Sequence, residues 1–286
     1  MKKFVSILAA AALCACTAVT AFADFNADRS ISVVSREDGS GTRGAFIELF
    51  GIEEKDAEGN KTDMTTQEAI VVNSTDVVLT TVAGDESAIG YVSLGSLNDT
   101  VKALKIDGVE ASTENIKAGT YTISRPFNNA TKGEPTGLAK DFIDFILSAE
   151  GQAVVSESYI TVNDEAAAYA GEKPEGKLVV AGSSSVSPVM EKLAEAYMAV
   201  NTGATIEIQT SDSTTGMQAA IDGTCDIGMA SRELTENETA ELTPTVIALD
   251  GVAVVVNNAN PLEDATSEQI KSIFTGESTV WSDVIG

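Results

Sequence analysis

Short apolar segments of extended character alternate with helical segments along this chain of 286 residues. Residues 31–35 precede a helical stretch at 42–50, and residues 178–181 precede another at 188–200. Strands and helices that alternate in this way fold as an α/β structure, in which helices cover a sheet. At roughly 150 residues per domain, the length predicts about two domains.

Three helical stretches have the apolar spacing of helices that pack on a sheet. Pro188 opens one of them, at a first-turn position that proline favours. Residues 138–149 repeat the same period, and Gly151 stands just beyond the expected end of this helix. Residues 266–269 have the pattern of a capping box that opens the third. We expect all three helices to be structural.

The composition excludes several kinds of chemistry. The chain has no histidine, which removes Ser-His-Asp and Cys-His nucleophiles and histidine-containing zinc sites. Its net charge of −25 argues against nucleic acid as a partner. Only Cys225 follows the first 23 residues, so no internal disulfide is expected after their removal, and we expect Cys225 to be a buried small residue.

The first 23 residues have the pattern of an export signal. Two lysines precede an apolar, alanine-rich run, and residues 21–23 read Ala-Phe-Ala, a small-x-small cleavage site. A retained membrane anchor fits less well because the run is short for a membrane span. Lipidation at Cys16 is a second route, and it would tether the protein to the outer face of a membrane. We therefore expect an exported protein.

Residues 35–43 form a strand–loop–helix junction that is suited to bind an oxyanion. Its two glycines let backbone N–H groups converge, its Ser and Thr add hydroxyl donors, and the helix N-terminus adds positive potential. Arg36 offers a bidentate guanidinium, and Asp38 could orient it by pairing with it.

Two further junctions, at residues 182–188 and 211–216, are also rich in hydroxyl groups. Each of the three taken alone is more simply a satisfied helix cap, because Ser, Thr, Asp and Gly are the ordinary capping residues. Three such junctions in one α/β chain, one of them with an arginine, favour convergence on a shared cleft. From the residues alone, both interpretations stay open.

The sequence resembles the phosphate-binding proteins that serve ABC-type phosphate importers. The resemblance covers nearly all of residues 31–160 and 177–286. Its most specific motifs are SREDGSGTR at 35–43, AIGYV at 88–92, SRP at 124–126, GSSSV at 182–186, DIGMASRE at 226–233 and IALDG at 247–251.

These motifs stand in a different order from that of the family, in which the motif of residues 182–186 comes first and that of residues 35–43 about halfway. The order predicts a circular permutation. The family's chain would run from residues 281–286 almost directly into 28–31, and residues 161–177 would join its usual ends. We therefore expect the region near residue 28 to lie beside the C-terminus. An assembly artefact or a gene fragment is the alternative.

The resemblance implies a two-lobed, Venus-flytrap fold of the type 2 periplasmic-binding-protein class, α/β in both lobes. The expected first lobe is discontinuous and comprises residues 28–118 and 259–286. The second comprises residues 119–258 and includes 161–177 as an exposed linker, and residues 1–23 are the signal peptide.

The resemblance also implies the site. The expected phosphate contacts are Arg36, Ser40, Gly41 and Thr42 from the first lobe and Ser185, the N–H of Val186, Ser213, Ser231 and Arg232 from the second. Ser184 is not separable from Ser185 as a ligand.

Two arginines of these motifs call for comment. Arg232 stands where some members carry an aspartate that accepts the proton of hydrogen phosphate, and it could bind the anion or pair with Glu233. That departure weakens any inference about selectivity against sulfate. We expect Arg125 to be a structural residue near the connection between the lobes.

The implied function is capture of inorganic phosphate outside the cell and delivery to the membrane permease of an ABC importer. The expected protein is a monomer without enzymatic activity, cofactor or metal. Binding of another oxyanion (sulfate, molybdate or a phosphonate) and phosphate sensing without transport are the alternatives. A hydrolase that uses a serine of residues 182–186 is disfavoured, because the chain lacks histidine and an obvious Ser-x-x-Lys motif.

Overall fold

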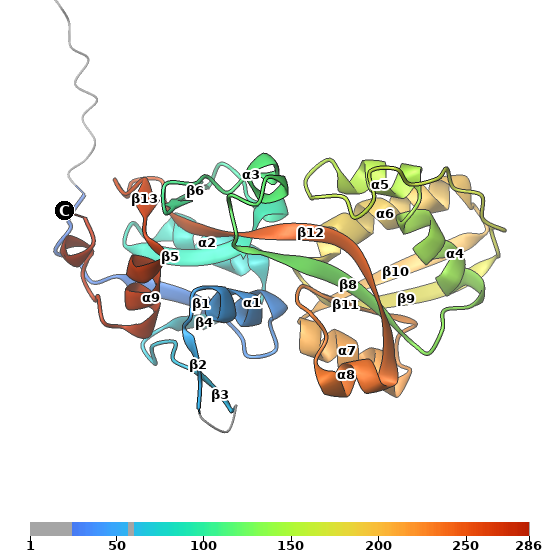
Figure 1. Cartoon of the computed structure of the whole chain (residues 1–286), viewed down its shortest axis with the longest axis horizontal. Coiled ribbons are helices and arrows are strands. Elements are labelled where there is room, and N and C mark those ends of the chain that lie inside the picture. Colours follow the sequence, from blue (N-terminus) through green and yellow to red (C-terminus); the bar gives the residue numbers. More distant parts are fainter. Residues whose placement is uncertain (1–24, 57–59, 286) are drawn as a thin grey trace, which may run out of the picture.

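The computed structural model describes residues 25–56 and 60–285 and has two α/β halves placed end to end (Figure 1). The expected export signal and Cys16 lie outside the described residues. Within the described part, no helix combines the length and the apolar character needed to cross a membrane.

Apolar strands form one nine-stranded sheet in the order β10-β9-β11-β8-β12-β5-β1-β4, with β6 paired to β12 at its side. The strands are β1 (Ser32–Arg36), β4 (Ile70–Val72), β5 (Ala88–Ser93), β6 (Val101–Ala103), β8 (Ser124–Lys132), β9 (Gly176–Ser183), β10 (Ala204–Ser211), β11 (Ile227–Ala230) and β12 (Leu242–Asn257). Two small sheets pair β2 (Glu53–Lys55) with β3 (Lys61–Asp63) and β7 (Lys105–Ile106) with β13 (Asp264–Ala265).

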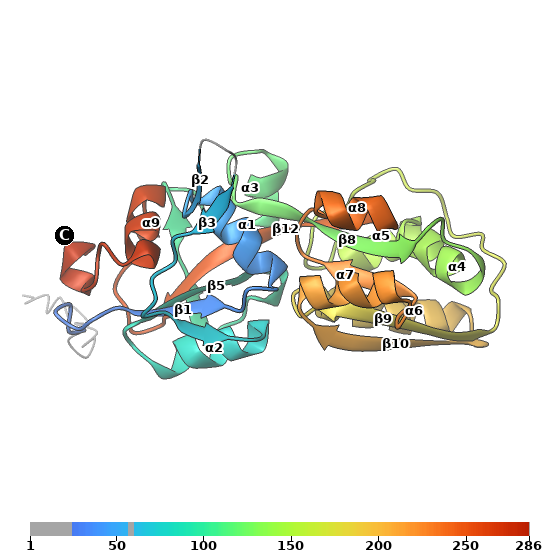
Figure 2. The same cartoon turned by 90° about the horizontal axis from the view of Figure 1, so that it is seen from below.

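The helices cover the faces of this sheet (Figure 2). They are α1 (Gly41–Leu49), α2 (Thr75–Gly84), α3 (Thr113–Lys117), α4 (Gly137–Ile146), α5 (Ala149–Val155), α6 (Ser187–Val200), α7 (Ser213–Asp222), α8 (Glu236–Glu241) and α9 (Ser267–Thr275), with short 3₁₀ turns η1 (Leu94–Ser96) and η2 (Trp281–Asp283).

Of the helices that we expected, those at 42–50, at 188–200 and from Thr266 are present as α1, α6 and α9, and the one at 138–149 differs. The capping box at Thr266 is confirmed, since its side chain accepts from the backbone of Gln269 and the Gln269 side chain accepts in return. The expected single helix at 138–149 is wrong. The chain instead breaks at Ser148, which caps α5 by accepting from the N–H of Gly151, so Gly151 lies inside a helix.

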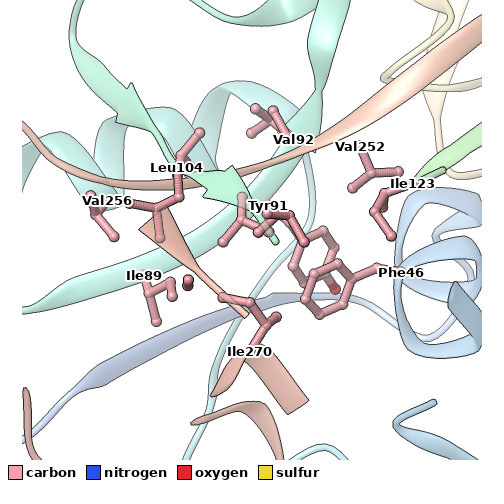
Figure 3. Close-up of a cluster of buried hydrophobic side chains, with 14 of the residues drawn as sticks. Phe46, Ile89, Tyr91, Val92, Leu104, Ile123, Val252, Val256 and Ile270 are labelled. Carbon is pink, nitrogen blue, oxygen red and sulfur yellow. The ribbon is translucent and has the colours of Figure 1, made fainter. Parts of the chain in front are cut away.

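Each half has its own hydrophobic core. In the first, the Phe46 ring stacks on Tyr91 with ring centroids 3.9 Å apart (Figure 3). Phe46 also meets the Phe274 ring edge-on, with centroids 4.6 Å apart. In the second, Phe142 and Phe145 pack against Tyr197. We call the part around the first core the first half and the part around the second core the second half. Cys225 is buried in a small adjoining cluster of the second half, which confirms the expectation for it.

Strand β12 runs through both halves. Its residues 242–251 pair with β8, whereas Val252–Val256 pair with β5 and are buried in the first core. Residues 252–256 fall in the range 119–258 that we expected for the second half. The packing thus places the crossing near Gly251, earlier than the sequence suggested.

The two ends of the described chain lie side by side in the first half. The N–H of Ile31 donates to the carbonyl of Thr279 at 2.8 Å, and the N–H of Ser282 donates to the carbonyl of Ala27 at 2.7 Å. This is the adjacency that we expected for residue 28 and the C-terminus.

The segment 161–177 is mostly exposed, but hydrogen bonds hold it to the second half. Asp141 of α4 accepts hydrogen bonds from the Tyr169 hydroxyl at 2.5 Å and the Glu172 N–H at 2.8 Å. It also accepts from Tyr197 at 2.6 Å. Burial acts to raise the pKa of Asp141, but these hydrogen bonds outweigh it and hold the pKa below its ordinary value.

Candidate functional site

The three predicted junctions meet where the two halves face each other. Each follows the carboxyl end of a parallel strand (β1, β9 or β10) and opens a helix (α1, α6 or α7). Ligands bind at this end of the strands in open α/β sheets, because the turns and helix N-termini converge there. The hydroxyl oxygens of Thr42 and Ser185, one from each half, are 2.8 Å apart.

The junction of the first half combines charge with a helix start. Strand β1 ends at Arg36, whose N–H donates to the Tyr91 hydroxyl at 3.1 Å. Ser40 caps α1 by accepting from the Arg43 N–H at 3.3 Å. The first residues of α1, Gly41 and Thr42, therefore direct a helix N-terminus at the second half.

Arg36 is buried, and its guanidinium reaches the other half. It donates to the Glu37 carboxylate at 2.8 and 2.6 Å and to Ser184 Oγ at 3.2 Å. The expected pairing of Arg36 with Asp38 is wrong, because the Asp38 side chain extends into solvent and pairs with Arg43 at 2.9 Å. Glu37 takes the role that we assigned to Asp38.

The junction at 182–188 supplies two serines with distinct partners. Ser184 Oγ accepts from Arg36, and Ser185 Oγ contacts Thr42 and, at 3.1 Å, Thr75 Oγ1. Both serines therefore reach the first half. The Val186 N–H, which we expected to face the anion, donates to the Ser183 carbonyl at 3.0 Å within the turn.

Ser213 and Ser231 close the site on the second half. The Ser231 N–H donates to Ser213 Oγ at 3.1 Å, and Ser231 Oγ accepts from Ser183 at 3.0 Å. A Cβ atom at position 41 would overlap Ser213 Oγ and lie 2.9 Å from Ser231 Oγ. Only glycine at 41 permits this approach of the two halves.

Arg232 lies at the edge of the site, where it pairs with an acidic side chain and donates to the Thr214 hydroxyl at 3.2 Å. Its guanidinium donates to the Glu238 carboxylate at 2.7 and 2.8 Å, and to Glu233 only through the backbone carbonyl. Glu238 stands opposite because it forms a capping box with Thr235 at the start of α8. Burial acts to raise the pKa of Glu238, but the bonds from Arg232 and Thr235 hold it below its ordinary value. Of the two alternatives for Arg232, pairing with the Glu233 side chain is thus wrong, and contact with the anion stays a prediction.

The sequence interpretation did not identify Thr75 as part of the site. Its N–H lies 3.4 Å from Ser184 Oγ, and its hydroxyl contacts Ser185. Asn73-Ser74-Thr75 follows strand β4 and opens α2, with Ser74 as the N-cap. This is a fourth hydroxyl-rich strand–helix junction, and the signal that identified the other three also marks it.

Arg125 lies at the crossing between the halves, near where we expected it. Its guanidinium and the Asp250 carboxylate form a buried ion pair at 2.9 Å. Burial lowers the pKa of Arg125 and raises that of Asp250, and their mutual attraction opposes both shifts. Arg125 also donates to Thr42 Oγ1 at 3.1 Å, which the sequence did not indicate.

This arrangement is suited to binding rather than catalysis. The hydroxyl groups of the site contact one another rather than a base. The nearby Glu37 carboxylate accepts hydrogen bonds from Arg36, so the described site offers no free base to activate a serine. Among residues 25–56 and 60–285, no group of three or more acidic or cysteine side chains could hold a metal ion. One arginine surrounded by neutral donors matches a small oxyanion.

Comparisons with known proteins show the family to which this chain is related. The profile of a PBP superfamily domain matches residues 4–150 and 167–286. Phosphate-binding protein PstS 2 of Streptococcus agalactiae is 58% identical over 257 residues, which are 89% of this chain and 88% of that protein.

A solved structure and a shorter match complete the comparison. The crystal structure of a phosphate-binding protein of a phosphate ABC transporter from Streptococcus pneumoniae TIGR4 is 47% identical, with a TM-score of 0.71, and the match covers 90% of this chain and 100% of that one. Phosphate-binding protein PstS of Bacillus subtilis is 37% identical over 140 residues, 48% of this chain and 43% of that protein.

Proposed function

The chain belongs to the phosphate-binding proteins of the PBP superfamily, and from this we propose that it captures inorganic phosphate between its two halves and delivers it to the permease of an ABC importer. The observation that carries the proposal is the contact of Thr42 with Ser185 across the two halves, beside the buried Arg36. A small tetrahedral anion at this point meets donors from both halves. The family is one of transport receptors, not enzymes.

We propose nine residues for the phosphate site. They are Arg36, Ser40, Gly41 and Thr42 from the first half and Ser185, the Val186 N–H, Ser213, Ser231 and Arg232 from the second. The Val186 N–H donates to the Ser183 carbonyl in this structure, so its proposed contact with the anion requires it to exchange that partner. The proposed role of Arg232 is at the rim, where its side chain approaches Gly41.

The energetics of the site fit a dianion. Removing the hydration shell of phosphate is costly, and hydrogen bonds to a charged group return about 1.5 to 3 kcal/mol each. The net charge of −25 repels phosphate at long range, but salt screens it over about 8 Å. Local donors therefore decide binding. Phosphate that contacts both halves favours the closed arrangement over an open one, which gives a permease a shape to recognise.

The proposal for the lobes and the chain order rests on the packing. We propose a discontinuous first lobe (residues 28–118 and 259–286, with 252–256 packed in its core), a second lobe formed by the rest of 119–258, and a linker at 161–177. We propose further that the order is permuted relative to other family members. The adjacent ends of the described chain support this, as does the match to the Bacillus subtilis relative over less than half of each chain. The Streptococcus agalactiae relative matches nearly end to end in the same order, which argues against an assembly artefact.

Solute-binding proteins of ABC importers are extracytoplasmic. We propose that this chain is exported by its first 23 residues and acts as a monomer. Lipidation at Cys16 would be the means of retaining it at the cell surface.

Calorimetric titration tests the function. Trp281 is buried in the first core, where its Nε1 donates to the Ser87 carbonyl, so heat is a more direct readout than its fluorescence. We expect phosphate to bind with a stoichiometry of one and sulfate, molybdate and phosphonates to bind more weakly. Absence of phosphate binding would overturn the proposal, and tighter binding of another oxyanion would replace phosphate as the ligand. Phosphate binding without capture by the permease would indicate a sensor.

A further inference from the structure

Arg125 makes more contacts than a structural ion pair requires. Nη1 lies 2.9 Å from Asp250 Oδ2 and donates to the Gly251 carbonyl at 2.9 Å. Nε donates to the Ser231 carbonyl at 3.0 Å, and Nη2 donates to Thr42 Oγ1 at 3.1 Å. One guanidinium therefore touches the crossing strand and one residue of the site on each side.

The pair is expensive to bury. The side chains of Arg125 and Asp250 are 3% and 1% exposed, and two desolvated charges are stabilising only when further hydrogen bonds satisfy them. The contacts with Asp250 and Gly251 would be enough to hold the Arg125 side chain, which comes from β8, against β12. The two remaining contacts lead instead to Ser231 and Thr42, the residues that bring β11 and α1 together.

The contact with Thr42 has a defined direction. A guanidinium has only donors, so the Thr42 oxygen must be the acceptor. The single proton of that hydroxyl then remains for Ser185, for Ser231 or for an oxygen of a bound anion. A positive charge on the oxygen side also polarises the hydroxyl and makes it a stronger donor.

We propose that Arg125 is a positioning residue for the anion site: anchored by Asp250 and by the Ser231 carbonyl, it orients and polarises the Thr42 hydroxyl so that this hydroxyl donates to the bound oxyanion. Arg125 does not touch the anion itself. The inference rests on the proposed function, because it needs an anion to receive the proton of Thr42.

A double-mutant cycle between Arg125→Lys and Thr42→Val tests it. Lysine keeps the charge opposite Asp250 but cannot hold Asp250, Ser231 and Thr42 together. We expect Arg125→Lys to weaken phosphate binding about 10-fold in the wild-type background and less than about 2-fold when residue 42 is valine. In the Thr42→Ser background, which restores a hydroxyl, the loss should return to about 10-fold. Equal losses with threonine and valine would overturn the proposal.

Comparing the stability of each variant with its phosphate affinity distinguishes a positioning role of Arg125 from a purely structural one. Arg125→Lys should lower the urea midpoint in both the threonine and the valine background, whereas its loss of affinity should appear only where residue 42 carries a hydroxyl. If Arg125→Lys fails to fold, the apolar pair Arg125→Met with Asp250→Leu removes both charges and can be placed in the same cycle. The control is Arg29→Lys, an exposed arginine whose ion pair with Asp85 is 3.7 Å long, and it should leave affinity unchanged.

The outcomes for the proposed function and for this inference can be told apart. If the wild type binds sulfate but no phosphate, the function is wrong, and the cycle repeated with sulfate still supports or overturns the role of Arg125. If the wild type binds phosphate and the cycle is additive, only the inference is overturned. Absence of binding to either anion overturns both.

Discussion

The two halves bring different chemistry to the same site. The first half supplies a buried cation, Arg36, at the end of a strand and the N-terminus of α1. The second half supplies neutral hydroxyl groups, those of Ser185, Ser213 and Ser231, and its own arginine is engaged by a carboxylate. Arg36 and Arg232 are thus both paired with a carboxylate, and both halves offer hydroxyl groups, but of these two arginines only Arg36 reaches a serine of the other half.

This difference suggests a division of labour. A cation attracts an anion over several ångströms, whereas a neutral hydroxyl contributes only at hydrogen-bond distance. We infer that the first half attracts the anion and that hydrogen bonds from the second half then stabilise the closed arrangement. The following substitutions test this division, from the strongest expected effect to the weakest.

Arg36→Ala removes the charge of the first half. We expect phosphate affinity to fall about 100-fold, because at least one charge-assisted bond is lost inside a closed site, while the fold is retained. Calorimetry measures the affinity, and circular dichroism checks the fold. Arg29→Ala, which removes an exposed arginine of the same half, should bind as the wild type does. Unchanged affinity on Arg36→Ala would remove this residue from the site.

Gly41→Ala leaves the polar groups of both halves unchanged but prevents the close contact between the halves. The added methyl group would overlap Ser213 Oγ, so we expect a loss of about 2 kcal/mol in binding, or about 30-fold, with little change in the free energy of unfolding. Gly84→Ala is the matched control, because a Cβ there has no neighbour within 4 Å. Tight binding by Gly41→Ala would show that the contact between the halves is not needed.

Ser185→Ala removes one neutral donor of the second half. The loss should be about 10-fold, smaller than that for Arg36, because a single hydroxyl is replaced. Ser187→Ala is the control: this buried serine belongs to the same turn but bonds within the second half, to the Ser183 carbonyl and Thr210. A loss on Ser185→Ala as large as that for Arg36→Ala would contradict the division of labour.

Arg232→Gln should change phosphate affinity by less than about 3-fold, because Glu238 already engages the guanidinium. The same substitution should lower the free energy of unfolding at pH 7 by about 1 kcal/mol, because the ion pair with Glu238 is lost. The folded-state pKa of Glu238 is lowered, so this stability is present above the ordinary glutamate pKa of about 4.3 and is lost as the pH falls through the folded value. Urea midpoints of variant and wild type should therefore converge below about pH 4. An affinity loss above about 10-fold would show that Arg232 contacts the anion directly rather than standing at the rim of the site.

The sequence revealed the parts of the site that follow a local pattern. Hydroxyl-rich residues between an apolar strand and a helix marked three turns, and the glycine at 41 marked a close approach of backbone. The same rule would have found Thr75. It could not find the Arg125 to Thr42 contact, because those residues are brought together only by the crossing of β8 between the halves.

The choice of charge partners was also beyond the sequence. Glu37 and Asp38 are adjacent carboxylates, and only the direction of each side chain decides which of them meets Arg36. Arg232 likewise passes over its neighbour Glu233 for Glu238, which the first turn of α8 places within reach. A pattern of residues predicts a kind of site, whereas its internal pairing depends on tertiary geometry.

The 16-residue strand β12 has a consequence for the molecule as a whole. One continuous backbone delivers Ile247 and Ala248 to the second core and Val252–Val256 to the first, without a flexible tether between them. If one core unfolds, it exposes the apolar side chains of β12 that it had buried, while the rest of the strand stays packed in the other core. We therefore expect the stabilities of the two halves to be coupled through this strand, even though the proposed ligand capture requires the halves to shift relative to each other.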